Sequence, residues 1–479
     1  MNRIEINAPN LWRLDTPGAA GWPRSARPDA AKKYFMVSAD GHANEPATLW
    51  FDRMDKKYHE RLPRVVTDKD GVQWRYCEGY RPDRLRLSTL EGEDMARNKA
   101  GAEPLGRLAD HDRDGIDVEL IFPNKGLAMW ATRDPQFAMA QCRVWNDWAW
   151  EQFGTHQDRM IPAGSIATGD LEGSIAEVQR LAKLGFKCLT LPCKPIWGGH
   201  DSNHVNYNLP HFDPLWAAIQ DANLPITFHV STGRDPRAAR GNGGAVVNYV
   251  SHSLSPTIEP VANLCASGVL ERFPKIRFAT IEAGIGWVPW LLGAMDEAYK
   301  KHHFWVRPKL QGLPSDYYRA HGFSSFQEDK AGLDLAESHG LDGNFMWAND
   351  YPHHEGTWPH SAEAIERTMG QLSDGARAKV LGLNCARFLG IDVPAKNKQR
   401  PAPCAARWPS PAWARPSILS TASRRIRSSC WPCRRSWRPA RMPASIRAGS
   451  TASPPTPTIA TIRRASPRRW ACRRCASPT

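Results

Sequence analysis

Four short apolar runs along the chain each end at a histidine or an acidic residue. Residues 34–39 lead into Asp40, 224–228 into His229, 276–281 into Glu282, and 343–349 into Asp350. Each run is bounded and almost wholly apolar, which predicts a strand buried on both faces. In a barrel of alternating strands and helices, the carboxyl ends of all strands lie on one face, where active sites form. We therefore expect the four side chains to meet at one site, as metal ligands or proton carriers.

The first of these runs ends in the tripeptide Asp40-Gly41-His42. In an extended chain the side chains of Asp40 and His42 point to the same side, so both could bind one cation. Asp-Gly is also a common turn signal, and by itself the tripeptide could simply end a strand. The three similar strand ends downstream favour a ligand role.

From residue 104 onward the chain alternates between predicted strands and predicted amphipathic helices. Besides the four runs above, strands are expected at 118–123, 161–167, 186–191 and 322–327. Helices are expected at 105–114, 135–153, 171–184, 212–221, 258–272 and 287–301, with further helices between residues 327 and 389. About eight strand-helix units of this kind predict an α/β fold, a (β/α)8 TIM barrel.

Segments outside these units define the expected domain organisation. Residues 1–33 form a polar N-terminal arm without periodicity, and residues 34–392 form the barrel domain. Residues 43–105 are turn-rich, charged and too long for a simple loop. We interpret them as an insertion after the first strand, over the barrel mouth.

Residues 393–479 form a basic tail whose composition differs sharply from that of the body. The tail holds 17 Arg and no acidic residue, so the formal net charge of +14 comes from it and the body is slightly acidic. Few aliphatic residues and many like charges predict disorder. Arg clusters with interleaved Trp could bind nucleic acid through phosphates and stacking, but no specific nucleic acid is expected. This composition is also typical of GC-rich codons in the wrong frame, and we hypothesise a frameshift from about Lys398 onward.

The compartment is indicated by cysteine usage and by the absence of targeting signals. The body contains six cysteines without close pairing, and the chain shows neither a signal peptide nor an apolar run long enough to span a bilayer. These features favour reduced, buried thiols in a cytoplasmic protein without a membrane partner.

Three motifs show a resemblance to a known family. They are Phe345-Met346-Trp347-Ala348-Asn349-Asp350-Tyr351-Pro352-His353, Arg272-Phe273-Pro274-Lys275, and Gly382-Leu383-Asn384-Cys385-Ala386-Arg387-Phe388. On these motifs, residues 34–392 resemble the amidohydrolase-related family (amidohydrolase 2), in the branch of TIM-barrel metal enzymes that includes aminocarboxymuconate-semialdehyde decarboxylase. The resemblance implies one divalent metal ion, usually Zn²⁺. In the family it is held by a first-strand pair, a fifth-strand histidine and an eighth-strand aspartate.

Carried over to this sequence, the resemblance puts four residues on the metal: Asp40, His42, His229 and Asp350. Two positions depart from the family pattern. Many relatives have histidine where this chain has Asp40, which leaves Mn²⁺ open beside Zn²⁺. The decarboxylases of the branch usually have a proton-handling histidine where this chain has Glu282, which weakens a decarboxylase assignment.

The proposed ligands are chemically consistent with one another. Two imidazoles and two carboxylates would neutralise a dication and leave a position for water, whose pKa the metal lowers. Asp350 or Glu282 could accept the proton of that water as catalytic base. Glu282 could instead form a structural salt bridge or cap a helix. His252, Arg234 and His353 are expected in loops on the same face, where they could bind an acidic or carbonyl substrate or simply be solvated.

The sequence therefore favours a metal-dependent hydrolase in which metal-activated water attacks a carbonyl-type small-molecule substrate. The alternative within the family is a nonoxidative decarboxylase, or a hydratase, acting on an aromatic or unsaturated carboxylic acid. A non-catalytic nucleic-acid binder acting through the basic tail is the least favoured interpretation. A homo-oligomer is compatible with all three.

Overall fold

The structure is a computed structural model that describes residues 4–394, except 86–89, 102, 196–204, 234–238 and 240. Nearly all of the predicted tail, and the predicted substrate-binding Arg234, lie outside the described residues. The chain divides into two units, Met1–Pro416 and Ser417–Thr479, and every described residue belongs to the first.

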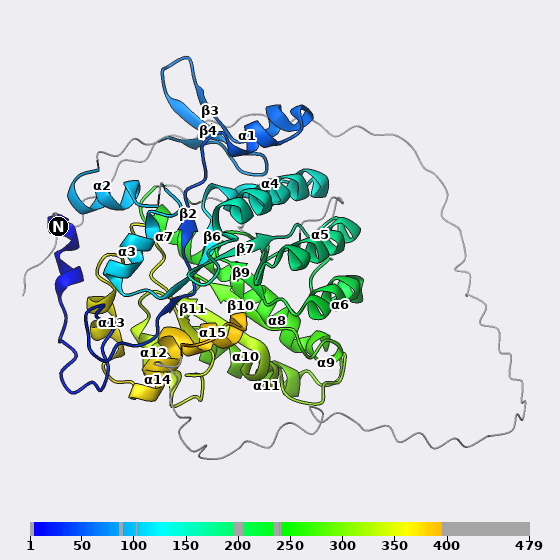
Figure 1. Cartoon of the computed structure of the whole chain (residues 1–479). Helices are drawn as coiled ribbons and strands as arrows, with labels where there is room; N and C mark the ends of the chain where they lie inside the picture. Colours follow the sequence, from blue (N-terminus) through cyan, green and yellow to red (C-terminus); the bar gives the residue numbers. More distant parts are fainter. Residues whose placement is uncertain are drawn as a thin grey trace, which may run out of the picture. The chain divides into compact units, whose positions relative to one another are not determined.

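Eight parallel strands form a barrel within this unit (Figure 1). In order around the sheet they are β1 (Val37–Ser38), β6 (Val118–Pro123), β7 (Met160–Ser165), β8 (Cys188–Leu191), β9 (Ile226–His229), β10 (Phe278–Ile281), β11 (Gly322–Phe326) and β12 (Phe345–Trp347). The short strand β2 (His42–Ala43) follows β1 and pairs with β6. The barrel closes between β12 and β1, where Asp350 N donates to Asp40 O at 3.2 Å. The (β/α)8 fold predicted from the sequence is confirmed.

Helices alternate with the strands along the chain and surround the barrel (Figure 1). They are α3 (Arg107–Asp114), α4 (Pro135–Phe153), α5 (Leu171–Leu184), α6 (Asp213–Ala222), α8 (Ile258–Ala266), α9 (Val269–Arg272), α10 (Val288–Lys301), α11 (Pro314–His321), α12 (Lys330–Ala336), α13 (Ser361–Met369), α14 (Asp374–Ala378) and α15 (Asn384–Leu389). Shorter helical segments are η3 (Lys125–Trp130), η5 (Pro210–Phe212), α7 (Gly244–Val247), η6 (Asn248–Leu254), η7 (Ser255–Thr257) and η8 (Lys379–Leu383). Within the described part of the chain, no helix has the length and apolar character required to cross a membrane.

Helix boundaries follow from the local sequence. The helix α4 begins after Asp134, whose carboxylate accepts two backbone hydrogen bonds from the first turn. Pro135 occupies the first position, where an amide donor would have no partner. The single helix predicted for residues 258–272 is two helices, α8 and α9. Gly268 between them is left-handed, with φ of 75°, and this conformation interrupts a helix.

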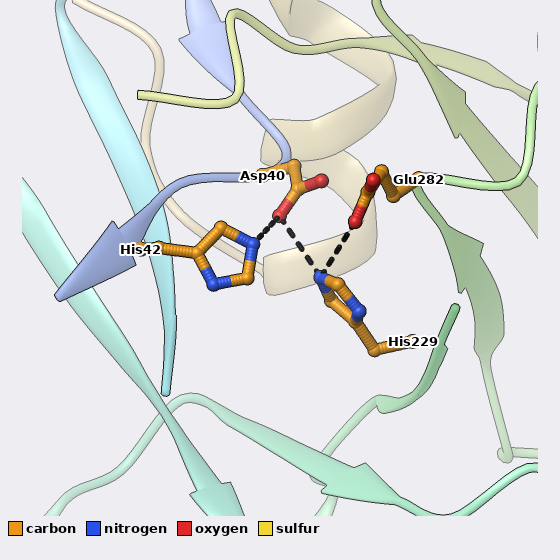
Figure 2. A group of neighbouring side chains, drawn as sticks. All are labelled: Asp40, His42, His229 and Glu282. Carbon is orange, nitrogen blue, oxygen red and sulfur yellow. Dashed lines mark hydrogen bonds and ion pairs between the residues drawn. The ribbon is translucent and has the colours of Figure 1, made fainter. Parts of the chain in front are cut away.

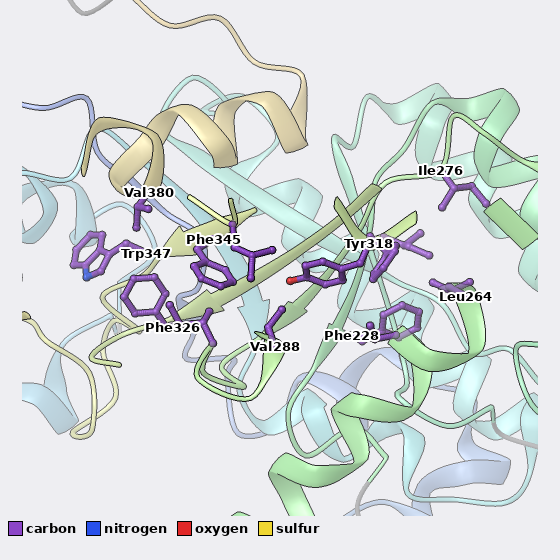
Figure 3. Packing of buried hydrophobic residues seen from close by; sticks show 14 of the residues in the cluster. Phe228, Leu264, Ile276, Val288, Tyr318, Phe326, Phe345, Trp347 and Val380 are labelled. Carbon is purple, nitrogen blue, oxygen red and sulfur yellow. The ribbon is translucent and has the colours of Figure 1, made fainter. Parts of the chain in front are cut away.

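Alternate residues of a barrel strand pack into two different apolar clusters. Phe345 and Trp347 belong to a cluster of residues from strands and helices, whereas Met346 belongs to a cluster in which most members come from the barrel strands. This alternation is what a pleated strand imposes, and it puts the first cluster outside the barrel and the second inside it. Figure 3 shows part of the first cluster, where Phe345 and Trp347 pack with residues such as Val380. Each fully buried side chain of this size contributes about 1.5–3 kcal/mol to folding.

The segment between β2 and α3 contains a small sheet of its own. Strands β3 (Arg64–Thr67), β4 (Gln73–Tyr76) and β5 (Asp83–Arg84) pair in antiparallel fashion and are not part of the barrel sheet. The same segment contains α1 (Leu49–Arg53), η2 (Lys56–Arg61) and α2 (Gly92–Lys99). The N-terminal arm contains one short helical segment among its described residues, η1 (Ala8–Leu14).

Candidate metal centre

Four residues at the predicted strand ends meet in one place (Figure 2). Asp40, His42, His229 and Glu282 are buried, and each offers one ligand atom within 4.8 Å of the others. His229 Nε2 lies 3.4 Å from Asp40 Oδ1 and 3.7 Å from Glu282 Oε2. His42 Nε2 lies 3.5 Å from the same oxygen of Asp40. The barrel thus brings side chains from β2 and from the ends of β1, β9 and β10 into one compact group.

Asp350, the remaining member of the predicted ligand set, adjoins this group. Its Oδ1 lies 3.5 Å from His42 Nε2. It shares one further group of possible ligands with His42 and His353, and another with Glu282 and Glu355. Glu282 therefore completes the compact group, and Asp350 adjoins it through His42 and Glu282. We refer to these five residues as the strand-end cluster: Asp40, His42, His229, Glu282 and Asp350.

Several polar atoms of the strand-end cluster have no hydrogen-bond partner in the protein. Asp40 Oδ2, His42 Nε2 and both carboxylate oxygens of Asp350 are buried without a hydrogen bond. Unpaired buried charge is strongly unfavourable, and such groups are normally paired or bound to a metal. Two imidazoles with carboxylates form a donor set that divalent ions such as Zn²⁺ and Mn²⁺ accept. The residues present therefore fit one divalent cation.

Backbone carbonyls orient both imidazoles toward the strand-end cluster. His42 Nδ1 lies 2.9 Å from Pro123 O, and His229 Nδ1 lies 2.9 Å from Val230 O. Because a carbonyl oxygen can only accept a hydrogen bond, we assign the proton of each ring to Nδ1, which leaves the Nε2 lone pair facing the cluster. Burial, followed by His353 and His229, lowers the pKa of His42 well below its usual value, which favours the neutral ring that binds metals.

The carboxylates that follow β10 and β12 have unusual electrostatic and backbone properties. Burial, followed by Asp350 and Asp40, raises the pKa of Glu282 well above its usual value. Burial also raises the pKa of Asp350 to about 6, even though His353 lowers it. Both residues are left-handed, with φ of 58° at Glu282 and 52° at Asp350. This conformation costs roughly 1–3 kcal/mol for residues other than glycine and is concentrated at functional sites.

The sequence of this barrel matches one family of known proteins. The profile of an amidohydrolase family, amidohydrolase 2, matches residues 39–391. The chain belongs to the amidohydrolase-2 family. The resemblance inferred from the three sequence motifs is therefore confirmed, and the family is one of enzymes.

Individual relatives of this amidohydrolase-2 protein are distant. It is 22% identical over 349 residues to the gamma-resorcylate decarboxylase of Rhodococcus jostii (strain RHA1), a match that covers 70% of this chain and 97% of that protein. An amidohydrolase of Mycobacterium avium subsp. paratuberculosis K-10 has a similar structure, with a TM-score of 0.61 and 20% identity over 76% of this chain and 100% of that one. The 5-carboxyvanillate decarboxylase of Novosphingobium aromaticivorans DSM 12444 superposes with a TM-score of 0.55 and 15% identity, over 75% of this chain and 97% of that one.

The loop after β12 brings a third histidine to the strand-end cluster of this amidohydrolase-2 protein. His353 Nδ1 lies 3.1 Å from Asp350 Oδ1, and its ring stacks on that of His42 with centroids 4.1 Å apart. Burial alone would lower the pKa of His353, but Asp350 raises it to about 9. A cationic imidazole at this place suits the predicted role of His353 in binding an anionic substrate, a role that stays a prediction.

The other two predicted substrate-binding residues are not seen at the cluster. His252 is buried in η6, with Nδ1 3.1 Å from Asn248 Oδ1, and it belongs to none of the possible ligand groups found among the described residues. Arg234 lies outside the described residues. Their roles therefore stay predictions made from loop position alone.

Two residues near the cluster were not predicted from the sequence. Glu355 shares a group of possible ligands with Glu282 and Asp350. Tyr249 is 46% exposed as a whole, but desolvation of its hydroxyl, followed by Glu282 and Asp350, raises its pKa above the usual range. Glu355 follows the His353 motif by two positions, so an extended motif would have included it. Tyr249 lies in a stretch without periodicity, and no sequence signal connects it with the strand ends.

A second buried group of charges, which includes Glu119 of β6, contacts the backbone at Gly41 and His42. Glu119 Oε1 accepts a hydrogen bond from Arg107 Nη2 at 2.8 Å, and Glu119 Oε2 lies 2.8 Å from His111 Nε2. Arg107 also donates to His42 O at 3.1 Å. A Cβ atom at Gly41 would overlap the Glu119 carboxylate, so only glycine lets the two strands approach this closely. We call Glu119, Arg107 and His111 the Glu119 cluster.

Proposed function

We propose that this protein is a metal-dependent nonoxidative decarboxylase that acts on an aromatic carboxylic acid. The proposal is supported by relatives that are decarboxylases, of gamma-resorcylate and of 5-carboxyvanillate. The observation that carries it is geometric: two buried carboxylates, Glu282 and Asp350, lie among the possible metal ligands, where either could serve as a proton donor. The sequence alone favoured a hydrolase over a decarboxylase, and this proposal reverses that ranking.

The proposed cofactor is one divalent metal ion per chain. Asp40, His42 and His229 would hold it, with Asp350 or Glu282 as the fourth ligand. When bound, the ion would supply positive charge that orients and polarises the oxygen atoms of the substrate. The 5-carboxyvanillate decarboxylase of Novosphingobium aromaticivorans was solved with bound manganese. Because histidine and carboxylate ligands suit Mn²⁺ as well as Zn²⁺, we propose to test both ions.

Nonoxidative decarboxylation replaces a carboxylate by a proton at one carbon of the aromatic ring. A general acid adds a proton to the carbon that bears the carboxylate. The C–C bond then breaks, its electron pair returns to the ring, and carbon dioxide leaves. Whichever of Asp350 and Glu282 does not bind the metal is the candidate for this proton donor, because both are buried beside the possible ligands.

His353 is the proposed contact for the anionic part of the substrate. Its ring lies at the edge of the strand-end cluster, and its pKa of about 9 keeps it cationic at neutral pH. A charged imidazole forms stronger hydrogen bonds to a carboxylate or phenolate than a neutral donor does. His252 and Arg234 stay further candidates for the same role.

A metal-dependent hydrolase is the second candidate function, and Glu282 is the residue that favours it. A carboxylate 3.7 Å from a possible metal ligand is well placed to take a proton from attacking water. The decarboxylases of the resembled branch usually have histidine at this position, so the acidic residue is a specific difference in this chain. The two functions release different products, which makes them separable in one assay.

The deciding experiment uses the full-length protein loaded with Mn²⁺ or Zn²⁺. Hydroxybenzoates and methoxyhydroxybenzoates carrying a ¹³C-labelled carboxylate are incubated with the protein in D₂O. The proposal expects labelled carbon dioxide and one deuterium on the ring carbon that lost the carboxylate. A parallel panel of esters, lactones and amides tests the hydrolase. Release of acid and alcohol or amine from that panel, with no labelled carbon dioxide from the first, would overturn the proposal.

A further inference from the structure

The loop between β12 and α13 carries His353 and Glu355 toward the strand-end cluster, yet it contains no helix or longer strand. Its internal backbone hydrogen bonds include those from His353 N to Asp350 O at 2.9 Å and from Gly356 N to His353 O at 3.2 Å. The loop also lies tightly against the end of β12, since a Cβ atom on Gly356 would lie 2.8 Å from Asp350 O. Two further carbonyl groups of the loop, those of His354 and Gly356, are bound by two arginines from outside the strand-helix units.

Arg13 binds the loop from the N-terminal arm. Its Nη1 donates to Gly356 O and its Nη2 donates to His354 O, both at 2.7 Å. Arg13 is only 6% exposed, although it belongs to a segment that precedes the barrel. The arm is held in turn by Arg367 of α13, which donates to Asp15 O at 2.9 Å. A planar guanidinium with two parallel donors fixes both the position and the direction of the carbonyls it binds.

Arg97 binds the same two carbonyls from the segment between β2 and α3. Its Nη1 donates to His354 O at 2.7 Å and to Gly356 O at 3.1 Å. Glu93, one turn earlier in α2, lies 2.7 Å from Arg97 Nη2, and both side chains are at most 1% exposed. Two guanidiniums from two separate segments therefore meet at the same two carbonyls of one loop, those of His354 and Gly356.

We propose that Arg13 and Arg97 are positioning residues that hold the loop 353–356 so that His353 stays against Asp350 and His42. The proposal rests on the proposed function, because it assigns His353 a part in that reaction. Neither segment belongs to the eight strand-helix units of the barrel. We therefore infer that these contacts serve the site and not the barrel fold. A displacement of about 1 Å in a reacting group can lower a rate by about 100-fold, so a loosened loop is costly even when the fold is intact.

The first test compares two arginines of the N-terminal arm in the full-length, metal-loaded protein. Arg13→Ala should lower kcat/KM by about 10- to 100-fold while metal content per chain stays at the wild-type value. Arg27→Ala is the matched control, because Arg27 binds Glu363 and Glu366 of α13. It should keep turnover near the wild-type level. Equal losses in the two variants would overturn the proposal, since they would report only a loosened arm.

The second test asks whether the guanidinium fork is what matters. Arg13→Lys keeps the charge but cannot bind two carbonyls in parallel, so its turnover should lie near that of Arg13→Ala. Added guanidinium ion, at a concentration that leaves the wild-type melting curve unchanged, should restore part of the turnover of Arg13→Ala and none in Arg27→Ala. If Arg13→Lys is fully active and guanidinium ion does not restore Arg13→Ala, the two parallel donors of the Arg13 guanidinium have no role.

Arg97 needs a paired variant, because removing it alone leaves the buried Glu93 uncompensated. Glu93→Leu combined with Arg97→Met removes both charges at similar volume and should fold. The double variant should show the same loss of turnover as Arg13→Ala. If it folds with wild-type kcat/KM, Arg97 has no positioning role.

Hydrogen exchange provides a readout that does not depend on the reaction. Peptides that cover residues 353–357 should exchange faster in Arg13→Ala and in the paired Arg97 variant, whereas peptides of β9 and β10 should be unchanged. Unchanged exchange of the loop would overturn the proposal for any substrate. If the wild-type protein decarboxylates nothing in the panel, the proposed function fails, while the exchange measurement still decides whether the two arginines hold the loop.

Discussion

Two groups of buried charge lie on either side of the first strand, and they differ in how their carboxylates are paired. In the Glu119 cluster both carboxylate oxygens lie 2.8 Å from a nitrogen of Arg107 or His111. Burial raises the pKa of Glu119, but these two neighbours lower it below its usual value. In the strand-end cluster both oxygens of Asp350 lack a hydrogen bond, and burial raises its pKa to about 6.

The comparison shows that burial alone does not distinguish a structural charge from a functional one. Glu119 and Asp350 are both fully buried. One is neutralised by side chains of the chain itself, so it contributes to folding without any added partner. Asp350 has one cationic neighbour, His353, with Nδ1 3.1 Å from its Oδ1, and its Oδ2 has no hydrogen-bond partner, so its charge is only partly compensated within the chain. The extent of pairing, and not depth, distinguishes the candidate site.

The largest expected effect comes from removing a ligand of the strand-end cluster. His229→Ala should lower metal affinity by more than about 100-fold and abolish turnover, because the site loses a neutral donor that no neighbour can replace. Elemental analysis and turnover are measured on the same preparations. His321→Ala, which removes a buried histidine outside the cluster, is the control and should keep its metal. Metal retained in full by the His229 variant would contradict the ligand assignment.

The next prediction separates ligation from proton transfer at the two acidic strand ends. If Glu282 handles protons, Glu282→Gln should keep the metal while turnover falls by about 10²-fold or more. Asp350→Asn should lose both metal and turnover if Asp350 is ligand and acid together. Glu282 belongs to the compact group of possible ligands. The opposite result, with metal lost from Glu282→Gln and retained by Asp350→Asn, would therefore also be informative. A Glu282→Gln protein without metal would make Glu282 the fourth ligand and leave Asp350 as the proton donor.

Breaking the Glu119 cluster should affect folding and leave metal binding intact. Glu119→Gln removes the charge that Arg107 and His111 share, and loss of one partner from a buried ion pair costs about 3–5 kcal/mol. Urea denaturation of the metal-free protein should show this loss. Metal content per folded chain should stay at the wild-type value. Loss of metal at urea concentrations where the protein is still folded would mean that the two clusters are one functional unit.

The smallest expected effect is a difference in pH dependence between metal-free and metal-loaded protein. The folded-state pKa of Asp350, about 6, lies above its usual value of 3.8. In the metal-free protein, the contribution of Asp350 to the free energy of unfolding is therefore fully present below pH 3.8. It is lost as the pH rises through about 6. Between pH 5 and 7 the metal-free protein should lose about 1 kcal/mol of stability that the metal-loaded protein retains. The same pH dependence of the melting temperature in the two forms would contradict a raised pKa of Asp350 in the metal-free protein.

The sequence predicts most of the barrel and the meeting of its strand ends because both follow from short-range patterns. Bounded apolar runs identified the eight strands, and the residue after each of four runs identified Asp40, His229, Glu282 and Asp350. The family resemblance put Asp350 on the metal as the fourth ligand, whereas the compact group of possible ligands in the structure contains Glu282. That choice depends on left-handed backbone conformations at both positions, which turn the side chains at angles that an extended strand does not imply.

Other parts of the site arise from tertiary packing and carry no local signal. Arg13 and Arg97 lie in segments without periodicity, and only the folded chain shows that they bind the same carbonyls. The pairing of Glu119 with Arg107 depends on how closely β6 approaches Gly41. Hydrophobic patterns of period 2 and 3.6 describe one strand or one helix by itself. They therefore do not predict contacts between a helix and a loop that are distant in the sequence.

The left-handed backbone at Glu282 and Asp350 has a consequence for laboratory evolution of this protein. Asn and Gly adopt positive φ more readily than Glu or Asp does, and either residue would also remove one of the crowded negative charges. Substitutions that abolish catalysis at these two positions should therefore raise the melting temperature of the metal-free protein. A library selected for thermal resistance alone would be enriched in inactive members, with changes concentrated at the two strand ends that define the site.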